Sequence, residues 1–460
     1  MDRQPVARVL IIEQGEGLWG AQRFVLRLAP LLEQRGIEQI LAAPAGSATA
    51  AAWRAAGREH VVLPVPANRA LRRADGRPSA PLAAREAVRT AATAARMARI
   101  AGRLGVDVVQ ANSHWSHLEA ALASAACRRP ALLVLHEENE PDLIGRLRGV
   151  AVRAAARTVA VSDAVAASLP GWAAGRTVVI RNGVDTDALS PGPADPGVRA
   201  SLSTNPAAPL VLAMSRLDPR KGIDKVIRAV AALPDHLAST RLAVAGAPSL
   251  DPTSGTSLRR LGAELLGDRV VFLGARSDIG DLLRASDVLV LASSLEGLPL
   301  SVLEAQACGR PVVSFPTSGI PEVITDGATG LLARQDDVDD LSAGIARVLG
   351  DQTLAELLGA RARASVVAHH TLAAQADAMA GTLISLAGRA RRSGRAGGTA
   401  RRRPTRGRLL PDVGRRFDPG PDPGPGPGPD RNRDRDPRSG LDDHDHPDRD
   451  LHHHTIERRR

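Results

Sequence analysis

Short apolar runs alternate with longer amphipathic stretches along the first 185 residues of the chain. The runs have the length and continuous apolar character of buried strands, and within residues 6–182 they are VARVLII, EQILAAP, DVVQAN, ALLVLH, RTVAVS and TVVIRN. Between them lie helix-like segments such as AQRFVLRLAPLLEQRG, residues 21–36, which ends on the glycine expected after a helix. Strands alternating with helices are typical of a parallel sheet covered on both faces.

A second series of the same kind follows the proline-rich stretch PGPADPGVRASLSTNPAAP, residues 191–209. Its strand-like runs, within residues 210–333, are LVLAMS, RLAVAG, RVVFLG, DVLVLAS, PVVSF and TGLLA. We therefore predict an α/β protein in which two Rossmann-like, doubly wound domains, residues 1–190 and 210–366, face each other across a cleft. Residues 191–209 are predicted to link them. Residues 367–388 are predicted to form a closing helix that packs back towards the first domain.

The composition changes from residue 389, where a basic segment is followed by DPGPDPGPGPGPDRNRDRDPRSG. Such a sequence cannot bury enough apolar surface to offset the entropy of ordering, so we predict that 389–460 is disordered. These residues hold 19 Arg and 12 acidic residues, and therefore carry +7 of the net charge of +10. The nearly neutral remainder argues against a body built to bind nucleic acid, and we expect no specific nucleic-acid partner.

Cysteine content and hydropathy favour a cytoplasmic protein. The two cysteines, Cys127 and Cys308, cannot build a disulfide framework, and no CxxC pair indicates a metal knuckle. No apolar run reaches the length of a membrane span, and the first apolar run ends at Glu13, too soon for a signal peptide.

A basic helical stretch leaves membrane contact open. Residues 83–105 read AAREAVRTAATAARMARIAGRLG. Its arginines would form either a solvated helix face or a peripheral contact with the inner face of an anionic membrane, and they are Arg85, Arg89, Arg96, Arg99 and Arg103.

Three glycines after the first strand, Gly15, Gly17 and Gly20, form a literal G-x-G-x-x-G. The placement fits a dinucleotide fingerprint, but the second strand ends in Ala-Ala-Pro, with no acid to hold a ribose. An NAD-dependent oxidoreductase therefore remains only an alternative. The glycines still allow a loop and a helix N-terminus to lie close to a ligand.

Both lysines of the chain lie in SRLDPRKGIDKV, residues 215–226, whereas every other basic residue among the 60 Lys and Arg is arginine. Lysine is a point charge and arginine a planar fork, so Arg216 and Lys221, five residues apart, can bind phosphate oxygens in complementary ways. A solvated helix start is the alternative. Lys225 faces the helix surface at this spacing and is expected to be solvated.

The segment ASSLEGLPLSVLEAQACGRPVVSF, residues 292–315, contains the strongest candidate site. A strand runs into a loop with Glu296 and Gly297, and a helix then extends from Pro299 to about Cys308. At the helix start, free N–H groups and the positive end of the dipole would bind an anion, and these are the N–H groups of Leu300, Ser301 and Val302. Glu296 and Glu304 suit hydroxyl groups on either side of that anion.

This segment resembles a known signature. Glu296 and Glu304 are separated by seven residues in E-G-x-P-L-x-x-x-E-A-x-A-x-G-x-P-V-V, which resembles glycosyltransferase family 4, retaining enzymes of the GT-B fold. SRLDPRKG is similar to the family's other donor-domain motif. Further matches, within the similar region of about residues 6–385, are VSDAV at Val161, RNGVDTDAL at Arg181 and GLWGAQRFVLRLAPLLEQRG at 17–36.

The resemblance implies a GT-B protein that moves a hexose-type sugar from a nucleoside diphosphate sugar to an acceptor. The acceptor is not identified by the sequence, and a cell-envelope glycan or glycolipid is one option. Arg216 and Lys221 would neutralise the leaving diphosphate, and Glu304 would accept hydrogen bonds from the ribose. Glu296 and His136 would lie near the donor sugar; for His136, a satisfied histidine at a strand end is the alternative.

Gly17, Trp19 and Gly20 are expected to form the acceptor-side loop. The family often has Gly-Gly-Ala-Glu there, whereas this chain has Trp19-Gly20-Ala21-Gln22, so contacts at the loop are expected to differ. No acidic cluster occurs at a strand end, and we expect no metal cofactor.

Three questions stay open at this level. Residues at another strand end either line an acceptor pocket or simply pack, and they are His114, Trp115 and His117. The same fold would also suit a nucleotide-sugar hydrolase or epimerase. A protein of a different class, a non-catalytic scaffold whose basic tail binds nucleic acid or membrane, is the third possibility.

Overall fold

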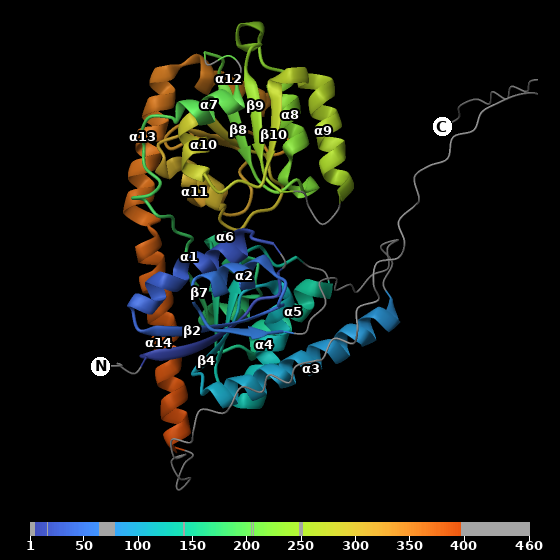
Figure 1. The fold of residues 1–460 in the computed structure, drawn as a ribbon, viewed down its shortest axis with the longest axis vertical. Helices are drawn as coiled ribbons and strands as arrows, with labels where there is room; N and C mark the ends of the chain where they lie inside the picture. The colour runs from blue at the N-terminus through green and yellow to red at the C-terminus, as the bar shows by residue number, and fades with distance from the viewer. Residues whose placement is uncertain are drawn as a thin grey trace, which may run out of the picture. The chain divides into compact units, whose positions relative to one another are not determined.

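The computed structural model of the chain describes residues 5–15, 17–63, 79–140, 143–203, 205, 207–247 and 252–396. All of them belong to one unit, Met1–Thr399. The described residues form two parallel sheets with helices packed on both faces of each (Figure 1). The α/β architecture predicted from the alternating pattern is confirmed.

The first sheet has seven parallel strands in the order β3-β2-β1-β4-β5-β6-β7. They are β1 (Ala7–Ile12), β2 (Ile37–Ala43), β3 (His60–Val62), β4 (Val108–Ala111), β5 (Ala131–Leu135), β6 (Arg157–Ala160) and β7 (Thr177–Val179). The chain reverses direction across the sheet between β1 and β4, so the connections after these two strands lead in opposite directions. The short strand β3 was not among the predicted strands.

Alternate residues of the first sheet face opposite helical layers, which is why its strands read as continuous apolar runs. Leu10 and Ile12 of β1 pack with α3 (Ala80–Leu104) and α4 (His114–Cys127), whereas Val9 and Ile11 pack with α1 (Gly20–Gln34) and α14 (Leu372–Ala396). The other helices of this region are α2 (Ala48–Ala55), α5 (Leu143–Ala154) and α6 (Asp163–Ala167).

The second sheet repeats the design with six parallel strands in the order β10-β9-β8-β11-β12-β13. They are β8 (Leu210–Met214), β9 (Arg241–Ala245), β10 (Val270–Gly274), β11 (Val288–Leu291), β12 (Val312–Ser314) and β13 (Leu331–Leu332). The reversal here lies between β8 and β11. The helices are α8 (Ile223–Ala231), α9 (Pro252–Leu266), α10 (Ile279–Ala285), α11 (Leu300–Ala307), α12 (Val338–Gly350) and α13 (Gln352–His369).

The C-terminal helix α14 belongs to the first sheet, although it follows the second in the chain (Figure 1). Its Met379 and Leu383 are fully buried against β1 and α1. The chain reaches it through Thr371, which pairs with Val184 in an isolated bridge. The expectation of disorder from residue 389 is wrong for 389–396, which continue α14. The remainder of that stretch lies outside the described residues.

The stretch 191–209 contains a helix, α7 (Pro196–Leu202), that packs on α10. Asp195 caps it by accepting hydrogen bonds from the N–H groups of Gly197 and Val198. The proline at its first position fits the helix start, so the proline content that indicates a linker also suits a short helix.

Candidate functional site

The loop after β8 lies at the reversal point of the second sheet and contains both predicted phosphate-binding cations. It runs from Ser215 through a short 3-10 turn, Pro219–Lys221, capped by Asp218. Gly222 ends the turn with φ +63, and a Cβ on it would lie 2.0 Å from the backbone oxygen of Ala292 at the end of β11. Only glycine allows this approach, and it brings the two strand ends together.

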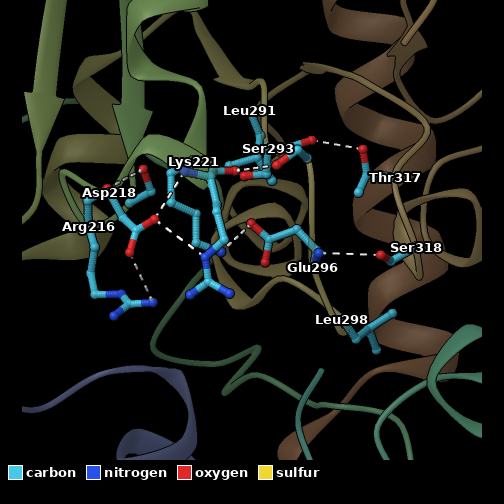
Figure 2. A network of polar contacts seen from close by, with 12 residues as sticks. Arg216, Asp218, Lys221, Leu291, Ser293, Glu296, Leu298, Thr317 and Ser318 are labelled. Carbon is cyan, nitrogen blue, oxygen red and sulfur yellow. Dashed lines mark hydrogen bonds and ion pairs between the residues drawn. The ribbon is translucent and has the colours of Figure 1, made fainter. Parts of the chain in front are cut away.

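Lys221 and Glu296 meet across these strand ends (Figure 2). The Lys221 ammonium donates to Glu296 Oε1 at 2.7 Å, and both side chains are largely buried. The loop is fixed further by Ser318, whose hydroxyl accepts the Glu296 N–H at 3.3 Å. The two residues, 75 positions apart in the chain, therefore form one polar site.

Helix α11 starts at Leu300, directly after this loop, with Pro299 as its N-cap. No side chain of the described residues caps it, so its first N–H groups, including those of Ser301 and Val302, remain available to an anion. Glu304 lies one turn in and is buried.

Glu304 already has a cationic partner that the sequence did not indicate. Arg27 of α1 forms an ion pair with Glu304 Oε1. The Arg27 Nη1 atom is buried and has no hydrogen-bond partner among the residues that the structure describes. The predicted ribose-binding carboxylate belongs to a helix that packs on the second sheet, and its cationic partner belongs to a helix that packs on the first sheet.

His136 directly follows β5 and lies beside the Glu296–Gly297 loop. A Cβ on Gly297 would lie 2.0 Å from the His136 backbone oxygen, so these segments are in direct contact. The imidazole packs edge-on against Phe24, with 4.9 Å between ring centroids. Burial lowers the pKa of His136 to about 4, which keeps the ring neutral at pH 7. The placement fits the predicted proximity to the other site residues.

The glycine-rich loop before α1 contacts the loop after β8. Trp19, the N-cap of α1, lies under the guanidinium of Arg216, with 4.5 Å from the Arg216 Cζ to the ring centroid. A Cβ on Gly17 would lie 2.6 Å from the Trp19 ring, so glycine at 17 makes room for the indole. Gly20 is the first residue of α1. Trp19, predicted on the acceptor side, therefore contacts a predicted donor-site cation.

The contact leaves Arg216 able to bind phosphate. Stacking uses the face of the guanidinium, whereas its hydrogen-bond donors lie in the plane at the edge. The closest carboxylate oxygen, Asp218 Oδ2, is 4.0 Å from Nη2. Arg216 thus keeps donors for an anion between the loop after β8 and α11.

Three other residues named from the sequence, His117, His114 and Lys225, make contacts within the protein. His117 is a buried packing residue that hydrogen-bonds to the Val134 backbone oxygen at 3.0 Å, so it does not line a pocket. His114 is exposed and bonds to Glu137 at 3.0 Å. Lys225, expected to be solvated, instead pairs with Asp336 and lies over the Phe315 ring. The charge lies at the surface, as expected, but its partner was not foreseen because Asp336 is 111 positions away in the chain.

A group of polar residues under the site was not predicted. Glu13, at the end of β1, is fully buried and accepts from the N–H of Gly15 and the side chains of Gln22 and Asn112. Asn112 in turn faces His136 Nε2 at 3.0 Å. A signal was present, since Glu13 and Asn112 each follow a buried strand directly, and a polar residue at that position is placed at the carboxyl edge of the sheet.

The segments that follow β8 and β11 thus place two cations, a helix N-terminus and two carboxylates at the carboxyl edge of the second sheet. Such a set suits a polyhydroxylated molecule with a diphosphate, because cations and N–H groups take the anion while carboxylates accept from hydroxyls.

Comparison with known proteins agrees with this chemistry. The family model described as "Glycosyl transferases group 1" matches residues 197–365, and the one described as "Glycosyltransferase Family 4" matches residues 19–188. The chain is 34% identical over 225 residues to a D-inositol 3-phosphate glycosyltransferase of Mycobacterium sp. (strain JLS), covering 48% of each protein. The corresponding protein of Mycolicibacterium smegmatis is 33% identical over 264 residues, covering 56% of this chain and 57% of the relative. The chain thus spans about half the length of these curated relatives.

Solved structures share the fold. HepE of Anabaena in complex with UDP-glucose superposes with a TM-score of 0.69 at 23% identity, covering 82% of this chain and all of HepE. Sucrose-phosphate synthase from Thermosynechococcus elongatus gives 0.66 at 20% identity, covering 85% of this chain and all of the synthase. At these identities the likeness establishes the GT-B arrangement of two Rossmann-like sheets and no more.

Proposed function

The chain belongs to glycosyltransferase family 4, and from this premise we propose that it is a retaining glycosyltransferase that uses a nucleoside diphosphate hexose. The observation that carries the proposal is the Lys221–Glu296 bond, 2.7 Å long, at the start of α11. It joins the two donor-side motifs into one site, with Arg216 beside it. The activity, the donor and the acceptor are all part of this proposal, because the chain matches the curated relatives over only about half of their length.

The reaction requires negative charge to leave with the diphosphate. Lys221 and Arg216 would bind the phosphate oxygens, and the N–H groups at Leu300 would add the helix dipole. Contacts that strengthen as charge builds up on the departing group lower the barrier rather than only holding the donor. We propose that these groups make a metal cofactor unnecessary.

The remaining residues would hold the sugar and nucleoside. Glu304 would accept from the ribose hydroxyls through the carboxylate oxygen that Arg27 does not bind, and Glu296 would meet the donor sugar when Lys221 turns to the phosphate. His136 would contact the same sugar. Attack by the acceptor on the face from which the diphosphate leaves retains the anomeric configuration, as the family implies.

The two lysines supply a matched test of the site. We expect Lys221→Ala to lose nucleotide release from a nucleotide sugar by 100-fold or more, since a charge-assisted contact to the leaving group contributes about 1.5–3 kcal/mol and a buried Glu296 is left unpaired. Lys225→Ala, which removes a surface pair with Asp336, should keep the wild-type rate. Equal rates for the two variants would refute the assignment.

UDP-glucose is the first donor to test, because HepE is bound to it in its crystal structure. Protection against thermal unfolding by a panel of UDP-, GDP- and ADP-hexoses would rank base and sugar together. D-inositol 3-phosphate is the first acceptor to test, because the curated relatives are named for it. Product analysis without acceptor separates transfer from hydrolysis or epimerisation, which would consume the donor alone.

We further propose peripheral contact with the cytoplasmic face of a membrane. No helix among the described residues is long and apolar enough to cross a bilayer. Helix α5 nevertheless exposes a row of apolar side chains interspersed with arginines, consisting of Leu143 (53% exposed), Ile144, Arg146, Leu147, Val150 (59%) and Arg153. Such a face suits the boundary of an anionic bilayer.

Vesicle co-sedimentation tests this contact. The protein should bind vesicles containing one-third phosphatidylglycerol better than phosphatidylcholine vesicles, and Val150→Glu should abolish the difference. Val367→Glu, at an exposed apolar position of α13, is the control. If Val367→Glu has as large an effect, or no vesicles bind, α5 is not a membrane face.

A further inference from the structure

Three polar side chains, Glu13, Asn112 and His136, are hydrogen-bonded in series, and their bonds can be assigned donor by donor. The series begins at Glu13, whose carboxylate is fully buried. Its Oε1 accepts the Gly15 N–H at 2.7 Å and the Gln22 side-chain amide at 3.0 Å, and its Oε2 accepts the Asn112 amide at 2.6 Å. An ionised carboxylate only accepts, so every partner must present a hydrogen to it.

Those bonds fix the orientation of the Asn112 amide. Besides Glu13 Oε2, the Asn112 Nδ2 group donates to the Ala21 backbone oxygen at 2.7 Å. Both partners are acceptors, so the nitrogen of Asn112 must face them and the oxygen must face the other way. A rotated amide would place oxygen against two oxygens in a buried site.

The Asn112 oxygen then determines the protonation of His136. Oδ1 lies 3.0 Å from His136 Nε2, and an amide oxygen can only accept. Nε2 must therefore carry the hydrogen, and in the neutral ring Nδ1 is left with a lone pair. Burial keeps the pKa of His136 well below neutrality, although Glu137 acts in the opposite direction. His136 as a whole is half-buried, and its Nδ1 is not one of the buried side-chain atoms that lack a hydrogen-bond partner in the described part of the chain.

We propose that Asn112, held by Glu13, is a positioning residue that fixes His136 in the Nε2–H form and so presents Nδ1 as a hydrogen-bond acceptor to a substrate hydroxyl. The location supports a sugar hydroxyl, because the Glu296–Gly297 loop runs against the His136 backbone. The inference rests on the proposed function for the identity of the substrate, but the protonation pattern is a property of the free protein.

The free protein therefore supplies the first test. Long-range proton–nitrogen correlation spectra of ¹⁵N-labelled protein at pH 7.5 distinguish the two neutral forms of a histidine, and His136→Gln identifies the signals of His136. We expect Nε2 protonated and Nδ1 bare. A spectrum showing Nδ1–H, or an average of both forms, would overturn the assignment whether or not the protein transfers a sugar.

Two variants test the cause. Glu13→Gln presents an amide to Asn112 in place of a carboxylate oxygen, so only the Ala21 backbone oxygen still orients the Asn112 amide, and the two neutral forms of His136 should become mixed. Asn112→Leu should leave the two forms mixed. Gln39→Leu is the matched control, since Gln39 is a buried amide on the neighbouring strand that bonds only to the Ala29 backbone oxygen in the described residues. An unchanged His136 in both variants contradicts the role of the series.

The substrate-facing part has its own outcome. If His136 Nδ1 no longer accepts a hydrogen bond from the substrate, kcat/KM for the donor should fall about tenfold in Asn112→Leu. The His136→Gln variant should be affected equally, and the double variant should be no worse than either single variant. If the spectra follow the expectation while kcat/KM and donor affinity stay at wild-type values, Nδ1 does not meet the substrate. Unfolding curves identify any variant that fails simply because it is unstable.

Discussion

At the scale of single residues, the site departs from its family at Trp19. The indole takes a position where the family often has glycine, and it lies against Arg216, which is expected to bind the diphosphate. Its neighbour Gly17 has no side chain to obstruct the ring. The substitution therefore links the glycine-rich loop to the donor side through a cation–π contact.

We expect Trp19→Ala to weaken donor binding. A partly desolvated cation–π contact contributes about 0.5–2 kcal/mol, so the donor Kd should rise roughly 2- to 30-fold. Isothermal titration with the best donor of the panel measures the change. Trp172→Ala is the control, because its indole lies under Arg153 at 5.5 Å, in a contact of the same kind outside the site. An effect of equal size in both variants would assign the loss to general destabilisation.

Buried histidines also determine how stability responds to acid. Burial lowers the pKa of His117 to about 3, with Arg148 and His114 acting in the same direction, and that of His136 to about 4. The unfolded chain, with histidine pKa near 6.5, binds these protons first. The free energy of unfolding should therefore fall as pH drops from about 6.5 towards 4, by up to about 1.4 kcal/mol per pH unit for each histidine.

Urea unfolding between pH 8 and pH 5 measures that slope. His117→Leu should be less stable at pH 7, because the bond to Val134 is lost, but its slope should be shallower by about one histidine. Burial raises the pKa of Glu137, but His114 and Arg148 outweigh that effect and keep it at about 2 in the folded protein. Because Glu137 gains its proton at a higher pH in the unfolded chain, the free energy of unfolding should decline a second time below pH 4.5. A wild-type slope in His117→Leu would contradict the first part.

At the scale of elements, the site depends on loops that approach at backbone distance. Gly222 joins the loop after β8 to the end of β11, and Gly297 joins the loop before α11 to His136. These contacts let side chains on different strands meet without long linkers. The strand ends themselves need no such device, because parallel strands place them at one edge.

Gly222→Ala should disrupt both stability and donor binding. Alanine at a positive φ costs about 1–2 kcal/mol, and here its Cβ would also collide with the Ala292 oxygen 2.0 Å away. Gly57→Ala separates the two effects, since Gly57 has φ +72 but no atom within 4 Å of the added carbon. We expect Gly57→Ala to lose only the conformational part and to bind donor normally, as judged by thermal unfolding with and without donor. Equal destabilisation of the two would mean that the loop shifts freely.

At the scale of the whole molecule, helix α14 covers the first sheet with residues that follow the second. Its buried side chains contact β1 and β4, and its last described turn forms a bidentate ion pair, from Arg391 to Asp107 at 2.7 and 3.0 Å. Although burial of Asp107 acts in the opposite direction, this pair lowers its pKa. The final helix is therefore part of the first core.

Three truncations test this view. A chain ending at residue 396 should unfold at the wild-type temperature and keep its transferase activity. One ending at residue 388 loses the Arg391 pair and should be less stable by about 1 kcal/mol, because the pair is partly exposed. One ending at residue 371 uncovers Met379 and Leu383 and should not fold. Loss of activity at 396 would instead assign a role to the last residues, whereas the scaffold hypothesis expects the shortened chain to lose its nucleic-acid or membrane partner.

The strands other than β3, their parallel pairing and the two donor motifs followed from the sequence, because period, strand length and motif spacing are local properties of the chain. The partners of the motif residues did not. Arg27 and Glu304 stand 277 positions apart, and Glu13, Asn112 and His136 come from three strands, so only the packed sheets bring them together. A sequence states which groups can donate or accept, whereas the tertiary structure decides which of them meet, and hence which nitrogen of His136 is left to face a substrate.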